Sequence, residues 1–367
     1  MKKLKIAQLV PPWISVPPKK YGGTELIVSH LTEELIKRGH QVTLFASGDS
    51  ITRAKLISVC PKALYGVGIP WTDAFWPLLH TSTAFEKAKN FDIIHNHFHY
   101  FGLSFSSLVK TPVVTTYHGD FATAEKNPAK YQILEKFKRN YFISISNLQR
   151  KFTKVNLNFI ATVYNGINLK EFKFNNKSQN YLVWLGRITE KKGIIEAIRA
   201  AKKIKLPLKI AAKIDKNYLP DVKFYEEKVK PLIDGKQIQY LGEVTGSVRN
   251  ELLRNALALL NPIKWNEPFG LVMPEAMACG TPVVAFNRGS VPEIVKDGKT
   301  GFVVSQFDKK KKINIKGLVE AIKKVDQIDR KECRRRVEEN FTVEKMVDGY
   351  EEVYYKIVKR RQKNEKT

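Results

Sequence analysis

Short apolar or β-branched runs alternate with helical patterns along the whole chain, and this alternation constrains the fold more than any other feature. Strands separated by helices cannot pair as hairpins, so they form parallel sheets with crossover helices on the faces. In the first half, the runs predict strands at residues 4–10, 41–46, 92–96, 112–117, 141–145 and 161–164, and a helix at residues 25–38. In the second half, they predict strands at residues 181–185, 208–212, 238–241, 258–262, 282–286 and 301–304.

The fold class that this pattern predicts is α/β, with two doubly wound, Rossmann-like domains. A length of 367 residues fits two domains of ordinary size. Residues 169–180 are polar and lack a long apolar period, so we predict a linker there, between an N-terminal domain at residues 1–168 and a C-terminal domain at residues 181–344. Residues 345–367 have a helical pattern whose aromatic side chains are predicted to pack rather than to bind a ligand: Tyr350, Tyr354 and Tyr355.

The net charge of +27 is the strongest deviation in the composition. A field of this sign attracts anions such as phosphorylated small molecules or acidic membrane lipids, although a basic composition also serves solubility alone. No nucleic-acid-binding motif accompanies the charge, so nucleic acid is not an expected partner. No apolar run approaches the length of a membrane span. Cys60, Cys279 and Cys333 are odd in number and far apart, which predicts buried thiols in a reducing cytoplasm.

The segment "NEPFGLVMPEAMACGTPVVAF" contains two glutamates, Glu267 and Glu275, on either side of a glycine turn. Gly270 allows the backbone to turn into an apolar helix at residues 271–278, which Gly280 ends. A loop and helix start of this kind lie at the carboxyl edge of a parallel sheet and attract anions. We expect a phosphate there, with both carboxylates at the mouth of the site to accept hydrogen bonds from sugar or ribose hydroxyls. The alternative is that both are solvated surface charges.

Three further features follow strands in the same way. Arg187 and Lys192 come after the strand "YLVWLG", where a guanidinium and an ammonium could hold a diphosphate without a metal, or could be ordinary surface charges. His118 follows "TPVVTTY", in a position where a histidine is either structural or able to contact a ligand. Gly22 and Gly23 lie between the first strand and the first helix, where glycine permits close approach of a phosphate or forms a plain turn.

A cluster of histidines ends the third predicted strand. His95, His97 and His99 alternate along the chain, so a strand would place them on one face, as a metal site requires. No nearby carboxylate or cysteine completes a ligand set. We therefore favour binding of a ligand at this strand end over binding of a metal.

Several segments resemble one known family. They are the Glu-x7-Glu block with "ALALLNPI" before it and "GSVPEIVKDGKTGFVV" after it, "GRITEKKG", and the N-terminal "VPPKKYGGTELIVSHLTEELIKRGHQVTLFASGD". Over most of the chain they are similar to family 4 of the retaining, nucleotide-sugar-dependent glycosyltransferases. The resemblance implies the GT-B fold, in which two Rossmann-like domains face a cleft and the C-terminal helix, here residues 345–367, crosses back to the N-terminal domain.

The same resemblance implies roles for residues at matching positions. Arg187 and Lys192 would stabilise the departing diphosphate, whereas His118 and Glu267 would orient the sugar. Glu275 would bind the ribose. The remaining donor-binding residues would be Gly22, Gly23, Glu243, Val244, Phe269, Gly270 and Leu271, with residues 213–215 on the opposite side of the base pocket. The family needs no metal, so neither a metal nor another cofactor is expected. The strand end with His95, His97 and His99 would then bind the acceptor.

The predicted function is transfer of a hexose from a UDP- or GDP-sugar to a hydroxyl acceptor with retention at the anomeric carbon, in glycan or glycolipid synthesis. We predict a cytoplasmic protein and consider contact with anionic lipid at the inner face of the membrane as an extension. Two alternatives stay open, a non-catalytic polyanion-binding protein and a sugar-nucleotide epimerase on the same fold. Asn261, Pro262 and Ile263 stand where a Pro-Ser pair is frequent in the family, which leaves the donor nucleotide undecided.

Overall fold

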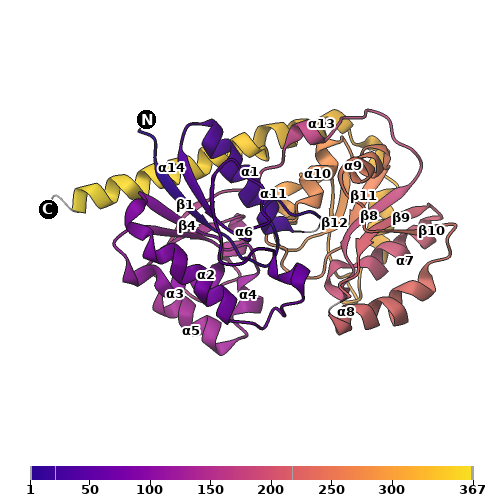
Figure 1. Cartoon of the computed structure of the whole chain (residues 1–367). Coiled ribbons are helices and arrows are strands. Elements are labelled where there is room, and N and C mark those ends of the chain that lie inside the picture. The colour runs from indigo at the N-terminus through magenta and orange to yellow at the C-terminus, as the bar shows by residue number, and fades with distance from the viewer. Residues whose placement is uncertain (1, 21, 217, 365–367) are drawn as a thin grey trace. The chain divides into compact units, whose positions relative to one another are not determined.

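The computed structural model describes residues 2–20, 22–216 and 218–364 (Figure 1). The chain divides into two compact units, the first comprising Met1–Gly166 and Val343–Thr367 and the second Ile167–Thr342. The prediction divided the chain at residue 168 and began the last helix at residue 345. The last three residues of that predicted helix, 365–367, lie outside the described residues.

In the described part of the first unit, seven parallel strands form a sheet in the order β3-β2-β1-β4-β5-β6-β7. Their bounds are β1 Lys5–Leu9, β2 Gln41–Phe45, β3 Lys55–Ile57, β4 Ile93–Asn96, β5 Val113–Thr116, β6 Tyr141–Ser144 and β7 Phe159–Thr162. The chain builds outward from β1 in one direction and then, from β4, in the other. This double winding is as predicted, but β3 was missed because three residues are too few to show a period.

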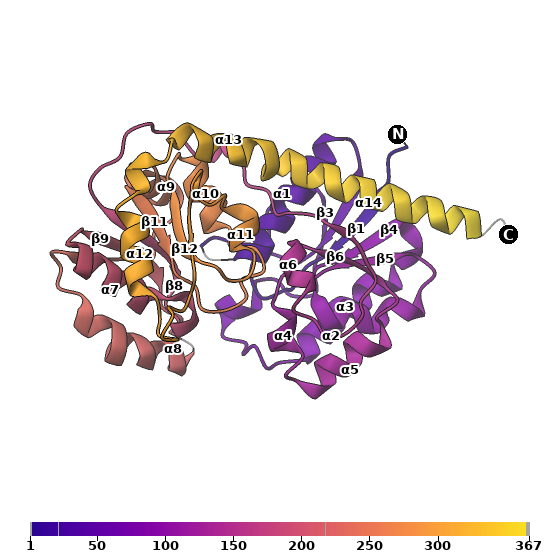
Figure 2. The ribbon, with the colours of Figure 1, turned by 180° about the vertical axis from the view of Figure 1, so that it is seen from behind.

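The helices of the first unit are α1 Gly23–Lys37, α2 Phe75–Glu86, α3 His99–Phe105, α4 Phe121–Ala124, α5 Pro128–Lys136, α6 Asn147–Arg150 and α14 Val343–Asn364. Helix α1 ends where Gly39 adopts a φ of 88°, a conformation that glycine takes without steric cost. Helix α14 packs against α1 and belongs to the first unit although it comes last in the chain (Figures 1 and 2). The predicted return of the C-terminal helix to the N-terminal domain is confirmed.

In the described part of the second unit, six parallel strands form a sheet in the order β10-β9-β8-β11-β12-β13. The strands are β8 Leu182–Arg187, β9 Leu208–Lys213, β10 Ile238–Gly242, β11 Ala258–Asn261, β12 Val283–Phe286 and β13 Gly301–Val304. The helices are α7 Ile194–Ile204, α8 Leu219–Phe224, α9 Gly246–Asn255, α10 Val272–Ala278, α11 Val291–Ile294, α12 Ile315–Ile322 and α13 Arg330–Asn340. Two doubly wound α/β domains were predicted, and the structure confirms them.

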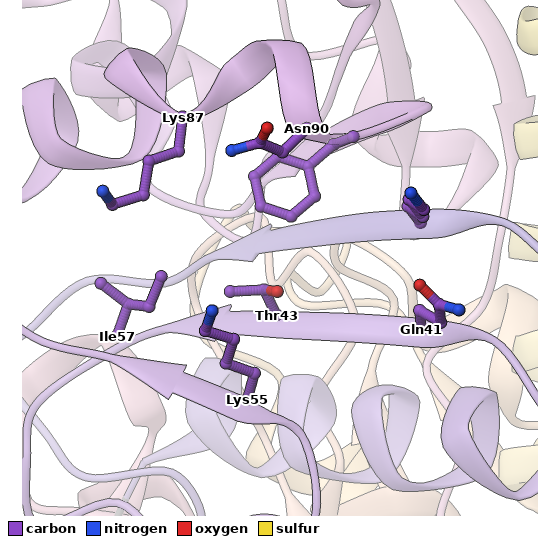
Figure 3. Close-up of a pocket in the computed structure, with 8 residues that line it drawn as sticks. Gln41, Thr43, Lys55, Ile57, Lys87 and Asn90 are labelled. Carbon is purple, nitrogen blue, oxygen red and sulfur yellow. The ribbon is translucent and has the colours of Figure 1, made fainter.

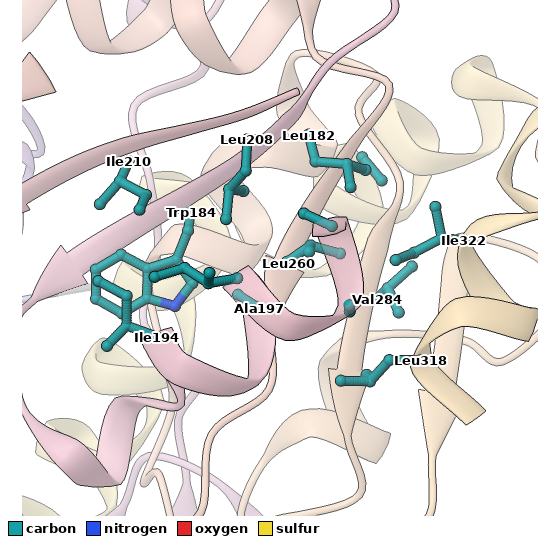
Figure 4. Close-up of a cluster of buried hydrophobic side chains, with 14 of the residues drawn as sticks. Leu182, Trp184, Ile194, Ala197, Leu208, Ile210, Leu260, Val284, Leu318 and Ile322 are labelled. Atoms are coloured by element: carbon teal, nitrogen blue, oxygen red, sulfur yellow. The ribbon is translucent and has the colours of Figure 1, made fainter. Parts of the chain in front are cut away.

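One face of the second sheet is closed by α7 and α12. Figure 4 shows Trp184 and Leu182 of β8, Ile194 of α7 and Leu318 of α12 within one buried cluster. Trp184 is 1% exposed, and burying an aromatic side chain of this size stabilises a fold by about 3 kcal/mol. The cluster fixes the strands whose carboxyl ends carry the predicted donor site.

The predicted linker at residues 169–180 is part of the second unit. Phe172 is buried, and its carbonyl oxygen accepts a hydrogen bond from Arg334 at 2.8 Å. The carbonyl of Asn175 likewise accepts one from Arg330 at 2.8 Å. Hydrogen bonds to backbone carbonyls thus attach the segment to α13, and such bonds leave no apolar period in the sequence.

Two predictions from composition can be compared with the structure. Cys60, Cys279 and Cys333 are free thiols and buried, as predicted. In the part of the chain that the structure describes, no helix combines the length and the apolar character needed to cross a membrane.

Candidate functional site

The second sheet reverses its winding between β8 and β11, which are neighbouring parallel strands. The loops that follow these two strands, at residues 188–193 and 262–271, therefore leave the same carboxyl edge in opposite directions. In doubly wound sheets, ligands bind at such a reversal. Arg187, Lys192, Glu267, Gly270 and Leu271 all belong to this edge.

Gly193 allows the two loops to touch. Its φ is 75°, and a Cβ atom added there would lie 1.9 Å from the carbonyl oxygen of Pro262. The backbone N–H of Lys264 also donates to the carbonyl of Lys191 at 2.8 Å. No residue with a side chain fits at position 193 without separating the loops.

An ion pair joins the same two loops. Lys192 Nζ contacts Glu267 Oε2, which also accepts a hydrogen bond from the indole N–H of Trp265 at 3.1 Å. The ammonium groups of Lys191 and Lys192 lie 4.3 and 5.2 Å from the centre of the Trp265 ring. Burial lowers the pKa of Lys191, and the neighbouring Arg187 and Lys192 add to the effect. The loops thus concentrate positive charge around one carboxylate.

Arg187 ends β8 beside two carboxylates. Its guanidinium lies 3.8 Å from Asp215 Oδ2 and 3.4 Å from Asp221 Oδ2. Burial raises the pKa of Asp221, and Asp215 contributes in the same direction, whereas Arg187 opposes both. Asp215 lies in the predicted segment 213–215. Asp221 was missed, because nothing in the sequence near residue 221 links it to a residue 34 positions earlier.

Glu275 is more buried than expected for a carboxylate at the mouth of a site, and it has a partner of its own. It is 6% exposed, and its Oε1 lies 3.3 Å from Nη1 of Arg249. Burial raises the pKa of Glu275, whereas Arg249 lowers it. A first-turn position predicts where a residue lies on its helix, but not that α9 supplies Arg249 beside it.

The other predicted donor-binding residues of the second unit differ in exposure. Phe269 is buried against Phe341, with ring centres 5.9 Å apart, and its carbonyl oxygen accepts a hydrogen bond from Ser290 Oγ at 2.6 Å. Gly270 has a φ of 83° and starts the turn into α10. Leu271 and Val244 are partly buried, whereas Glu243 is exposed just after β10, at the edge of the sheet.

In the first unit, Gly22 precedes α1 and Gly23 begins it. A Cβ atom at Gly22 would lie 2.7 Å from Cβ of Pro18, so the turn is tightly packed. Glu25, in the first turn of α1, is 6% exposed, and burial raises its pKa to about 7. This carboxyl group was not predicted from the sequence, where its only signal is its place two residues after the glycine pair.

His118 follows β5 and contacts His97, which follows β4. The distance from His97 Nδ1 to His118 Nε2 is 2.9 Å, and the rings stack with centres 5.2 Å apart. Burial lowers the pKa of His118 to about 3, and the charge of His99 acts in the same direction. A neutral imidazole at a strand end can orient a ligand hydroxyl, but it cannot act as a cation at neutral pH.

The histidine cluster is arranged differently from the expectation. His95 and His97 lie together, with ring centres 3.8 Å apart, but His99 begins α3. Among the residues that the structure describes, no group of three or more His, Cys, Asp or Glu side chains is placed to hold a metal ion.

A pocket of about 260 Å³ lies elsewhere in the first unit (Figure 3). Lys5, Gln41 and Lys55, the first residues of β1, β2 and β3, line it. Most of its lining residues begin or precede these strands, and neither His118 nor the glycine pair is among them. Ligands of doubly wound sheets bind at the carboxyl ends, so this pocket is not the candidate site.

Two family descriptions match the chain in succession. Residues 21–171 match "Glycosyltransferase Family 4" and residues 167–341 match "Glycosyl transferases group 1". Together they cover both units, including the glycine pair and the two loops of the second sheet. The chain belongs to glycosyltransferase family 4, and it is a glycosyltransferase.

Two curated relatives are similar over most of their length. The N-acetyl-alpha-D-glucosaminyl L-malate synthase of Bacillus anthracis is 26% identical, over 92% of this chain and 95% of that protein. The phosphatidyl-myo-inositol mannosyltransferase of Mycobacterium leprae is 24% identical, over 83% and 84%. The solved sucrose-phosphate synthase of Thermosynechococcus elongatus superposes with a TM-score of 0.78 at 20% identity, covering 97% of this chain and 99% of that one. The fold is accordingly GT-B.

Proposed function

We propose that the protein transfers a hexose from a nucleotide diphosphate sugar, UDP- or GDP-linked, to a hydroxyl acceptor with retention and without a metal ion, in glycan or glycolipid synthesis. The observation that carries this proposal is the Lys192–Glu267 ion pair between the two loops at the reversal of the second sheet. Family membership supplies the reaction class, and the ion pair supplies a charged site at the edge where the fold binds ligands.

The chemistry requires cations at the leaving group, because negative charge accumulates on a phosphate oxygen as the anomeric bond breaks. In the proposed mechanism, Lys192 and Arg187 stabilise the departing diphosphate. Each already lies beside a carboxylate, so its charge is held in place before the donor arrives. Glu267 and His118 orient the sugar, and Glu275, which Arg249 holds through Oε1, accepts hydrogen bonds from the ribose.

The test is a panel of UDP-, GDP- and ADP-sugars offered with sugar and lipid acceptors, with nucleotide release as the readout. Proton NMR of the first product formed reports the anomeric configuration. Transfer that continues in EDTA supports the metal-free mechanism, whereas complete loss contradicts it. Conversion of the sugar nucleotide without nucleotide release would indicate the epimerase instead, and tight polyanion binding without turnover would indicate the binding protein.

Lys192→Ala tests the proposed role of Lys192 most directly. We expect it to lower the transfer rate by about 10² or more, as the loss of one preorganised charged donor does. Lys202→Ala is the matched control, because Lys202 is an exposed lysine of the same unit, on α7. Equal rates for the two variants would refute the role of Lys192.

We also propose that the protein contacts anionic lipid from the cytoplasmic side of a membrane. The net charge of +27 favours it, as does a relative that acts on phosphatidyl-myo-inositol. Phe75, Leu78 and Leu79 lie at positions i, i+3 and i+4 of α2, on one helix face, and are 79%, 49% and 50% exposed. Such a face can enter a lipid headgroup layer.

Sedimentation with anionic and neutral liposomes, at low and high salt, tests the contact. We expect salt-sensitive binding to the anionic vesicles that Phe75→Ser weakens. Ile51→Ser is the control, because Ile51 is equally exposed, at 77%, but lies outside α2. Equal partitioning to both lipids, or to neither, contradicts the proposal.

A further inference from the structure

A chain of buried hydrogen bonds runs from His118 into the face of the first sheet that α14 covers. Gln8 of β1 pairs in register with His95 of β4, so both side chains point to the same face. Gln8 is 0% exposed, because β1 lies inside the sheet between β2 and β4. A polar side chain there requires partners, and it has two: His97 on one side and Tyr354 on the other.

The bonds form one continuous path. His118 Nε2 lies 2.9 Å from His97 Nδ1, and His97 Nε2 lies 2.8 Å from Gln8 Oε1. Gln8 Nε2 lies 3.3 Å from the hydroxyl of Tyr354, which lies 2.6 Å from His95 Nδ1. His95 Nε2 then reaches Oγ1 of Thr116 at 2.8 Å, and Thr116 donates to the hydroxyl of Tyr350 at 3.4 Å.

The amide of Gln8 gives the path a direction. Its Oε1 can only accept, so His97 must carry its proton on Nε2. Burial holds the pKa of His97 well below its ordinary value, so the ring is neutral and its Nδ1 is an acceptor. His118 must then donate from Nε2. Since burial also keeps His118 neutral, its Nδ1 carries no proton.

The far end of the path holds the amide in that orientation. Thr116 donates its one hydroxyl proton to Tyr350, so it accepts from His95 Nε2. Burial lowers the pKa of His95 and keeps the ring neutral, so its Nδ1 accepts the proton of the Tyr354 hydroxyl. The oxygen of Tyr354 is then left to accept from Gln8 Nε2. Turning the amide over would reverse these bonds and would place a proton on His118 Nδ1.

We propose that Gln8 and Tyr354 are positioning residues that fix the tautomer of His118 through His97, so that His118 offers Nδ1 as a hydrogen-bond acceptor. An acceptor recognises a hydroxyl and disfavours a carboxylate, which has no proton to donate at neutral pH. The ligand group facing His118 is therefore a sugar hydroxyl rather than the carboxylate of a uronic acid. This last step rests on the proposed function, whereas the tautomer does not.

Long-range proton–nitrogen NMR spectra of the ¹⁵N-histidine-labelled protein test the tautomer. In the parent protein we expect His97 and His118 with the proton on Nε2. Tyr354→Phe removes the partner that orients the amide, so we expect the His118 signal to change toward a mixture of tautomers. Tyr355→Phe is the control on the same helix, because its hydroxyl bonds the carbonyl of Lys2 at 2.9 Å, and it should leave the signal unchanged.

Gln8→Glu is a second variant with a different expected result. A carboxylate accepts from both His97 and Tyr354, so His118 should keep its Nε2 proton while the proton of His95 moves to Nδ1. A proton on Nδ1 of His118 in the parent protein would overturn the proposal. Identical His118 signals in Tyr354→Phe and Tyr355→Phe would do so as well.

Kinetics connect the tautomer to the reaction. We expect Tyr354→Phe to lower kcat/KM for the sugar donor about tenfold, the effect of one hydrogen bond, while the affinity for the nucleotide diphosphate alone stays at the Tyr355→Phe value. Equal losses of nucleotide and donor affinity would indicate a merely structural role and overturn the link to the sugar. If no nucleotide sugar is turned over but the NMR result holds, the proposed function fails and the tautomer assignment stands.

Discussion

Substitution of Gly193 by alanine should disrupt the loop contact that holds Lys192. The residue has a φ of 75°, in the left-handed region, where an alanine costs about 1 kcal/mol. Its Cβ would also lie 1.9 Å from the carbonyl oxygen of Pro262, whereas real Cβ atoms essentially never approach closer than 3.0 Å, so one loop must move by at least 1.1 Å. Forced displacement in a packed interior costs about 2 kcal/mol. We therefore expect Gly193→Ala to lose about 3 kcal/mol of unfolding free energy.

Gly298→Ala separates the two contributions. Gly298 belongs to the same unit and has a φ of 69°, but a Cβ atom added there would meet nothing within 4 Å. It should lose only the conformational cost of about 1 kcal/mol. Urea denaturation followed by circular dichroism measures both losses, and calorimetry with nucleotide diphosphate should show weaker binding for Gly193→Ala alone. Losses of unfolding free energy that agree within about 0.5 kcal/mol, the usual scatter of such values, would refute the argument. The contact of the new Cβ atom with Pro262 would then cost nothing.

Three further results are expected. Arg187→Ala should lower the transfer rate about 10²-fold, and Arg187→Lys should also be impaired, because an ammonium cannot reproduce the guanidinium fork; near-parental rates in either variant count against diphosphate binding there. Glu275→Ala should lose about 2 kcal/mol in urea denaturation, because Arg249 is left without its buried partner, and a loss below about 0.5 kcal/mol would contradict that pairing. The unfolding free energy should fall as the pH is lowered from 6.5 to about 4, because burial lowers the pKa of several histidines and the unfolded chain therefore binds protons that the folded chain does not. Glu25, whose pKa burial raises to about 7, opposes this trend. An unfolding free energy that does not change with pH over this range would contradict the prediction. The histidines concerned are His80, His95, His97, His99 and His118.

Local sequence was sufficient for most of the fold. Period and turn chemistry act over a few residues, so the strands of both sheets, the helix before Gly39 and the turn at Gly270 could be predicted within one or two residues of where they lie. The loops of the second sheet follow from the same reasoning, because parallel strands bring their carboxyl ends to one edge. Strand β3 was missed, since three residues carry no period.

The partners of the candidate side chains could not be predicted in this way. The burial of Glu275 depends on Arg249, and the orientation of Arg187 depends on Asp221, each from a different element. The aromatic period of α14 predicted packing for Tyr354, and the side chain is buried, but its hydroxyl also bonds His95, 259 positions away. Gln8 gave one signal, a polar residue inside an apolar strand, but no indication of which residues would satisfy it.

The sequence by itself determined two parallel α/β domains and the family to which the chain belongs, because both depend on patterns within short segments. Only the tertiary structure decided which charges are paired, which carboxylates are buried and which nitrogen of His118 carries its proton. The reason is physical. Desolvation and hydrogen-bond direction are set by the atoms within a few ångströms of a group, and here those atoms come from strands and helices up to 346 residues apart in the chain.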